Sequence, residues 1–162
     1  MVVDLLRRAG LKVIMASVMG RRDVKSSRGI LVHADCLAEN VDYHTAKMVF
    51  LPGGRLGTKN LGESTVVKEK CVEFANSKMV SAICAAPSVL DKLGLLDGKE
   101  ATCHPDYEHI MINAKRKHNP VVIDGNIITG RGLGSAFAFA FELMKMLGKE
   151  DKVETIKKQI CY

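Results

Sequence analysis

The chain has 162 residues, of which 47% are hydrophobic and 26% are charged, and its formal net charge is +6. This length suits one domain, residues 1–162, with a sizeable buried core, and the longest apolar runs are far too short to span a membrane. The cysteine count is 5, an odd number, and no two cysteines are closely spaced. The sequence therefore argues against a disulfide framework and against a zinc site.

Charge and cysteine usage also bear on partners and compartment. The basic residues are scattered, and the densest run, Lys115–His118, is typical of a solvated turn. The charge permits contact with nucleic acid, but we do not expect this to be the primary role. Asp4, Arg7 and Arg8 interrupt the only apolar stretch near the N-terminus, so we expect no signal peptide. Unpaired cysteines suit the reducing cytoplasm, with the nucleus or a mitochondrion as alternatives.

Apolar residues recur with helical spacing in some segments and form short runs rich in strand-forming residues in others. Such alternation is typical of an α/β sandwich with a mainly parallel sheet. In chain order we expect a helix at 2–9, a strand at 12–18, a polar loop at 20–29, strands at 30–33 and 47–52, a helix at 63–76, a strand at 79–83, a helix that begins after Cys84, a strand at 100–103, a hairpin of strands at 121–123 and 127–129, and helices at 135–147 and 149–160.

Cys84 lies where a short buried strand is expected to turn into a helix. Residues 79–83 suit a covered parallel strand, and Pro87 suits a first helical turn, where its missing N–H costs nothing. Unpaired amides and the positive end of a helix dipole favour a thiolate at such a turn, which resembles a nucleophile elbow. The alternative is a buried structural cysteine, and this local pattern does not decide between the two.

Other candidate residues follow neighbouring strands, where sites form in open parallel sheets. Gly53-Gly54 could present backbone amides to an oxyanion or be a plain tight turn. His104 could be a general base for Cys84 or a loop histidine without a chemical role. The glycine-rich run 130–134 lacks the spacing of a phosphate loop, so we expect close backbone packing there. The remaining cysteines are expected to be structural or incidental.

Several runs together resemble one known family. They are residues 6–13, 49–54, 56–61, 82–87, 102–105, and 129–132 with Gly134. With these runs the chain is similar to the DJ-1/PfpI superfamily over essentially its whole length, and most similar to its DJ-1 branch.

The resemblance implies a flavodoxin-like three-layer α/β fold, a homodimer, and a reactive cysteine at Cys84 that can be oxidised to a sulfinate. It also implies glyoxalase or deglycase activity on methylglyoxal and its adducts, together with redox-dependent protective or chaperone roles, and it implies neither cofactor nor metal. His104 matches the family's histidine near the cysteine. Arg28 matches an arginine that approaches the partner subunit's site, and Arg131 lies in a run that matches the family beside the site.

Two departures from the family pattern bear on function. Protease-like members have a histidine directly after the cysteine, whereas this chain has Ala85, which argues against peptidase activity. Family members begin with a strand, followed by a turn and a helix whose glutamate hydrogen-bonds to the cysteine. No residue of this chain matches that strand or that glutamate, and Asp4 lies further along the same helix. We therefore expect the first strand to be missing and a neighbouring strand to be unpaired on one side.

Two hypotheses for function follow. In the first, Cys84 adds to the aldehyde carbon of a small α-oxoaldehyde or acts on a glycated protein, amides of Gly54 and Ala85 hold the oxyanion, and His104 moves a proton. In the second, the chain is a non-catalytic redox-sensing chaperone in which Cys84 is only oxidised. Loss of glutathione-independent methylglyoxal consumption in Cys84→Ser would separate the two.

Overall fold

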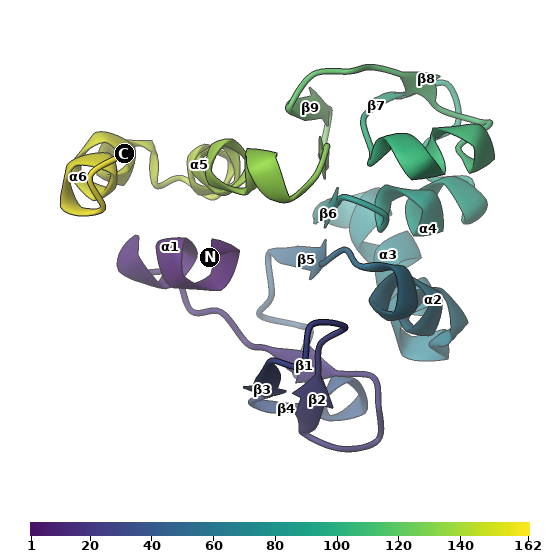
Figure 1. Ribbon diagram of the computed structural model, residues 1–162, viewed down its shortest axis with the longest axis horizontal. Coiled ribbons are helices and arrows are strands. Elements are labelled where there is room, and N and C mark those ends of the chain that lie inside the picture. The colour runs from purple at the N-terminus through teal and green to yellow at the C-terminus, as the bar shows by residue number, and fades with distance from the viewer.

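The computed structural model describes residues 1–162 as three layers, with a sheet between two groups of helices (Figure 1). The central sheet has the strand order β5-β6-β10-β9. Strands β5, β6 and β10 are parallel, and β9 pairs with β10 in the antiparallel sense across the hairpin expected at residues 121–129. The mainly parallel sheet is thus confirmed. The strands are β5 (Met48–Leu51), β6 (Met79–Ile83), β9 (Val121–Asp124) and β10 (Ile127–Gly130).

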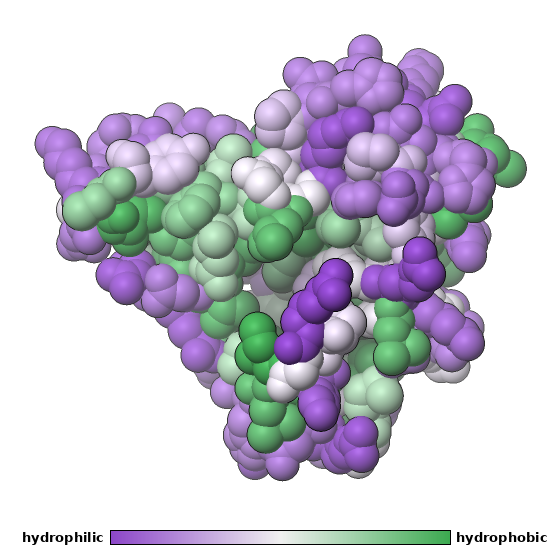
Figure 2. All heavy atoms as spheres, viewed as in Figure 1, coloured by the Kyte–Doolittle hydropathy of each residue, from purple (hydrophilic) through white to green (hydrophobic).

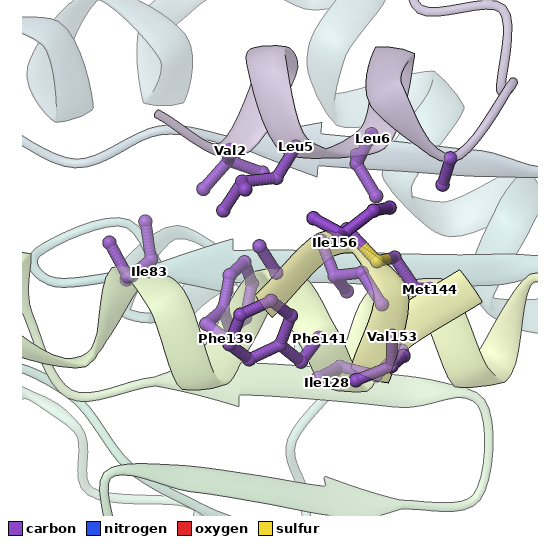
Figure 3. Close-up of a cluster of buried hydrophobic side chains, with 14 residues drawn as sticks. Val2, Leu5, Leu6, Ile83, Ile128, Phe139, Phe141, Met144, Val153 and Ile156 are labelled. Atoms are coloured by element: carbon purple, nitrogen blue, oxygen red, sulfur yellow. The ribbon is translucent and has the colours of Figure 1, made fainter. Parts of the chain in front are cut away.

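One face of the sheet is covered by the first helix of the chain and the last two (Figure 1). These are α1 (Val2–Arg8), α5 (Ala136–Met146) and α6 (Glu150–Gln159). Apolar residues at helical spacing on all three meet in one cluster, in which Leu5 faces α5 and Phe139 lies against the sheet (Figure 3). Phe139 is completely buried, and its ring centroid lies 5.6 Å from that of Phe50 on β5.

The other face is covered by α2 (Arg55–Glu63), α3 (Thr65–Ser77) and α4 (Pro87–Lys92) (Figure 1). Phe74, Cys71 and Leu90 are completely buried there, in a second cluster that also takes in Val80 and Ala82 of β6. Because both faces of β6 are covered, its continuous apolar sequence is the pattern that a central parallel strand requires.

The structure corrects several expected boundaries. The helix expected at 63–76 is α3, which begins at Thr65, and the helix α2 before it was not expected. The Ser64 side chain caps α3 by accepting a hydrogen bond from the Val67 amide at 3.4 Å. Only Ala16–Ser17 of the strand expected at 12–18 is paired, and the expected loop at 20–29 contains a strand. Lys115–Arg116 is a strand rather than part of a solvated turn.

Short elements complete the fold outside the central sheet. The structure contains no helix that is both long and apolar enough to cross a membrane. The short strands form three separate pairs: β1 (Ala16–Ser17) with β4 (Cys36–Leu37), β2 (Asp23–Lys25) with β3 (Leu31–His33), and β7 (Glu100–Ala101) with β8 (Lys115–Arg116), and the 3-10 turns are η1 (Ala38–Asn40), η2 (Pro105–Ile110) and η3 (Leu133–Ser135).

Strand β5 is paired on one side only, with β6. On its other side no strand is hydrogen-bonded to it, and β1 and β4 form a two-stranded sheet of their own. The expectation that one strand lacks a neighbour therefore agrees with the structure.

Candidate active site

Cys84 forms a strained turn between β6 and α4. Its φ of 66° lies in the left-handed region, which non-glycine residues rarely adopt. The turn is held on both sides, since the Cys84 amide donates to Gly130 O at 2.9 Å and the His104 amide donates to Cys84 O at 2.8 Å. These bonds fix the Cys84 backbone to β10 and to the segment after β7, and the side chain is left half-buried. This geometry is that of a nucleophile elbow.

Gly53 lies directly against the elbow. A Cβ placed on Gly53 would be 2.5 Å from Cys84 Cβ, 2.8 Å from Ile83 O and 3.3 Å from Cys84 Sγ. Any residue other than glycine would therefore push Cys84 out of its position. The glycine that follows β5 thus does more than form a tight turn, because it lets the end of β5 meet the Cys84 side chain.

Two backbone amides beside the elbow have no hydrogen-bond partner in the chain. They belong to Gly54, which precedes the first turn of α2 with a φ of 96°, and to Ala85, which follows the cysteine. The Cys84 amide itself is unavailable because it donates to Gly130 O. Unpaired N–H groups next to a nucleophile are the donors that an oxyanion needs, and they are the two amides that the sequence suggested.

His104 is placed by the 3-10 turn that it caps. Its Nδ1 accepts a hydrogen bond from the Asp106 amide at 3.3 Å, and its Cδ2 lies against Gly132, where an added Cβ would be 3.7 Å away. Nδ1 is therefore occupied within η2, and Nε2 is the ring nitrogen left for a substrate. No hydrogen bond joins the His104 ring to the Cys84 sulfur, so the two residues are linked through their backbones.

Arg131 belongs to a charged cluster that the sequence did not indicate. Its NH1 lies 3.2 Å from Glu108 Oε1, and His118 Nδ1 lies 3.3 Å from the same oxygen. Both distances fit an ion pair, but neither contact has the geometry of a hydrogen bond. Glu108 Oε1 is therefore buried without a hydrogen-bond partner. Glu108 lies on η2, so Arg131 connects the end of β10 to the turn that carries His104. Arg131 thus positions this turn rather than contacting Cys84.

Arg28 is not brought to the elbow within this chain. It is exposed in the turn between β2 and β3, where its amide donates to Ser26 Oγ at 3.3 Å.

The expected tight packing of the run 130–134 is confirmed at its start, because a Cβ on Gly130 would lie 2.8 Å from side-chain atoms of both Ile83 and Phe139.

The other cysteines differ from Cys84 in their surroundings. Burial raises the pKa of the Cys71 thiol to about 12. Burial, with a smaller contribution from the charge of Glu108, raises the pKa of the Cys103 thiol to about 11. Both thiols are therefore protonated and shielded near neutral pH. No group of three or more His, Cys, Asp or Glu side chains is placed to hold a metal ion.

Comparison with known proteins agrees with this geometry. A profile of the DJ-1/PfpI family matches residues 1–146. The protein dj-1beta of Drosophila melanogaster is 37% identical over 158 residues, which are 96% of this chain and 84% of that protein. The crystal structure of Drosophila DJ-1beta superposes with a TM-score of 0.93 at 36% identity and covers 99% of this chain and 88% of that one.

Two further relatives have names that state an activity. A glutathione-independent glyoxalase of Caenorhabditis elegans is 30% identical over 161 residues, covering 98% of this chain and 85% of the relative. A deglycase of Pyrococcus abyssi is 32% identical over 149 residues, covering 88% of this chain and 86% of the relative. The flavodoxin-like fold is confirmed by the superposition, and on the profile and the sequence identities the chain belongs to the DJ-1/PfpI family.

Proposed function

We propose that the protein is a cysteine-dependent, glutathione-independent glyoxalase or deglycase that acts on small α-oxoaldehydes such as methylglyoxal and on their protein adducts. The observation that carries the proposal is the Cys84 elbow, with its left-handed φ of 66° and the side chain pressed against Gly53. Strain of this kind persists where the surrounding structure enforces it, and it is concentrated at reactive sites. The names of the glyoxalase and deglycase relatives support the substrate class.

In the proposed reaction the Cys84 thiolate adds to the aldehyde carbon, and the C=O π electrons move to the oxygen. The product is a hemithioacetal alkoxide, which the amides of Gly54 and Ala85 stabilise until it takes up a proton. His104 Nε2 accepts the proton from carbon 1 and returns one to carbon 2, which converts the hemithioacetal into a thioester. Water then cleaves the thioester. The net reaction is methylglyoxal plus water to lactate, and the Cys84 thiol is regenerated.

The test is methylglyoxal consumption without glutathione, followed together with lactate formation. We expect wild-type protein to consume methylglyoxal and Cys84→Ser to lose the activity. Cys161→Ser is the matched control, because this thiol is exposed and follows the last helix of the chain, α6. An unchanged rate in Cys84→Ser would contradict the proposal.

The test also distinguishes the redox alternative. If wild-type protein consumes no methylglyoxal but gains mass at Cys84 when treated with peroxide, the protein is better described as a redox-responsive chaperone or sensor. Intact-protein mass spectrometry with peptide mapping would locate the added oxygen atoms.

We further propose that the protein is a homodimer in which Arg28 of one protomer approaches the site of the other. Arg28 and its neighbours are exposed, and Ile30 and Leu31 in the same hairpin each have 65% of their surface exposed. Exposed apolar residues gathered on one protruding segment are typical of an interaction surface. Light scattering that gave a mass near 17.7 kDa at micromolar concentration would contradict the dimer.

A further inference from the structure

A cavity of about 470 Å³ is lined by residues of α2, α3, α4 and η2. Its volume lies in the range of small-molecule sites. Helices α2 and α4 lie beside each other in Figure 1, and a Cβ on Gly62 of α2 would be 3.6 Å from Val89 Cγ2 of α4. Neither Cys84 nor His104 lines this cavity, which is therefore distinct from the candidate active site.

Basic side chains dominate the charged part of the lining. The lining contains four basic residues and a single carboxylate: Arg55, Lys59, Lys68, Lys92 and Glu63. Lys59 Nζ lies 3.8 Å from Glu63 Oε1, whereas the other three basic residues have no ion-pair partner in the chain. An anion in the cavity would therefore meet positive charge that the protein itself does not neutralise.

Exposed basic residues alone would describe only a solvated surface, but Thr58 adds a second observation. Thr58 lines the cavity with only 6% of its surface exposed, and its Oγ1 is buried without a hydrogen-bond partner. It lies one helical turn after Arg55 and one turn before Gly62, so these residues share the face of α2 that meets α4. The chain supplies no acceptor for this hydroxyl, and an oxygen of a bound anion would supply one.

The rest of the lining indicates what the anion is attached to. Val89 and Leu93 of α4 and Tyr107 and Ile110 of η2 form an apolar part of the cavity. An inorganic ion would leave this apolar surface in water, whereas an organic body would cover it. Figure 2 shows mostly hydrophilic residues at the upper right, where Figure 1 places α4 and β8, so this side of the molecule carries no broad apolar surface for another protein.

We propose that this cavity binds a small organic phosphate. Its phosphate group pairs with Arg55 and Lys92 and accepts a hydrogen bond from the Thr58 hydroxyl, and its apolar body lies against Val89 and Leu93. A phosphate monoester carries close to two negative charges at pH 7, which suits several unneutralised cations better than a carboxylate does. This inference is independent of the proposed activity, because it involves neither Cys84 nor the amides beside it.

The probe is 1-naphthyl phosphate, which carries a phosphate group on a fluorescent apolar body. We expect its fluorescence anisotropy to saturate below about 1 mM probe-binding protein, and to do so less readily as salt concentration rises. 1-Naphthol keeps the body without the charge, and inorganic phosphate keeps the charge without the body. We expect both to bind much more weakly, as direct ligand and as competitor respectively. Equal binding by either compound would overturn the proposal.

Charge-removing variants test the location of the site. Arg55→Gln combined with Lys92→Gln should weaken binding about tenfold, and both residues are exposed, so the fold should be retained. Glu63→Gln removes the carboxylate and should strengthen binding. Lys158→Gln is the matched control, because this exposed lysine lies on α6, which covers the other face of the sheet. An equal loss in Lys158→Gln would mean that only net charge attracts the probe and would contradict the proposal.

A pair of substitutions at Thr58 tests the buried hydroxyl. Thr58→Val removes it at nearly constant volume, and we expect binding about three- to tenfold weaker than in Thr58→Ser, which keeps it. Because the hydroxyl has no partner in the free protein, Thr58→Val should not lower stability in urea unfolding. Equal affinities of the two variants would overturn the assignment of this residue. Cys84→Ser should bind the probe as wild-type protein does, and loss of binding there would place the phosphate at the elbow and contradict a separate site.

Discussion

The elbow at Cys84 and the open edges of β1 and β5 are built in opposite ways. Around the elbow, Ala82 is completely buried and Ile83 has only 7% of its surface exposed. Gly53 and Gly130 are packed so closely that neither has room for a methyl group. Along β1 and the segment before it, every residue from Lys12 to Ala16 is at least partly exposed, and the backbone groups of Ile14 and Ala16 have no partner in the chain. Cys84 is thus held by a strand that is paired on both sides, whereas β1 and β5 are each paired on one side only.

The largest expected difference between the two regions is in the free energy of unfolding that is lost when a side chain is truncated. Phe139→Ala removes a completely buried ring beside Gly130 and Phe50, and we expect it to lower the free energy of unfolding by about 3–5 kcal/mol. Ile14→Ala, just before β1, should change it by less than about 0.5 kcal/mol, because this side chain is partly exposed. Urea unfolding with comparable m-values measures both. Equal losses would mean that the segment before β1 is as well packed as the core.

Alkaline pH should weaken the buried region through Cys71. Its pKa is raised by burial from 9.0 to about 12, so the folded state holds the proton more tightly than the unfolded state does. The associated stability is complete below pH 9 and is lost as pH rises towards 12, with about 2–3 kcal/mol lost by pH 11.

The measurement for Cys71 is urea unfolding at several pH values from 8 to 11. Cys71→Ala removes the titrating thiol, so its stability should fall less steeply with pH than that of wild-type protein. Cys36→Ala, at a partly exposed position on β4, should keep the wild-type slope. Parallel curves for all three proteins would show that Cys71 titrates as an ordinary thiol.

The fit of Gly53 to the elbow can be tested with a pair of glycine variants. Gly53→Ala places a methyl group 2.5 Å from Cys84 Cβ, and we expect a loss of about 1–3 kcal/mol in stability together with slower alkylation of Cys84 by iodoacetamide. Gly57→Ala, inside α2 with open space around it, should stabilise by about 0.5–1 kcal/mol and leave the alkylation rate unchanged. If Gly53→Ala left both stability and alkylation intact, the close contact would not be what shapes the elbow.

Strongly patterned elements of the fold were predictable from the sequence. The apolar run 79–83, the hairpin at 121–129 and the two C-terminal helices were identified because each has a local signal of its own. Helix α2 was missed because Gly57 and Gly62 weaken its helical signal, and its stability comes from packing rather than from propensity. The two-residue strands β1 and β8 were mispredicted because pairing with distant segments decides their extent.

Some residues of the candidate site could likewise be predicted from the sequence, and others could not. Cys84, Gly53 and His104 lie within three residues after the ends of β6, β5 and β7, so the general rule for parallel sheets indicated their positions. Glu108 and His118, which hold Arg131, were missed because their contacts span 10 or more positions and depend on the path of the chain around η2. Asp91 was also missed. It is 1% exposed, and its carboxylate accepts hydrogen bonds from the amides of Ile112 and Ala114, a loop some 20 residues away, which no local pattern reveals.

The smallest predicted effect would loosen the segment before β1 and leave the elbow unchanged. Asp35 Oδ2 accepts hydrogen bonds from the Met15 amide at 2.8 Å and from Arg7 NH2 at 3.0 Å, and so connects the segment before β1 to α1 and β4. Because both partners are exposed to solvent, Asp35→Ala should cost only about 0.5–1.5 kcal/mol. Amide exchange at Met15 should become markedly faster, while exchange at Val80 and Ala82 and alkylation of Cys84 should stay at wild-type rates. Faster exchange in β6 as well would mean that the β1/β4 pair and the central sheet unfold together, so that the open edge of β1 is coupled to the elbow although no hydrogen bond joins the two sheets.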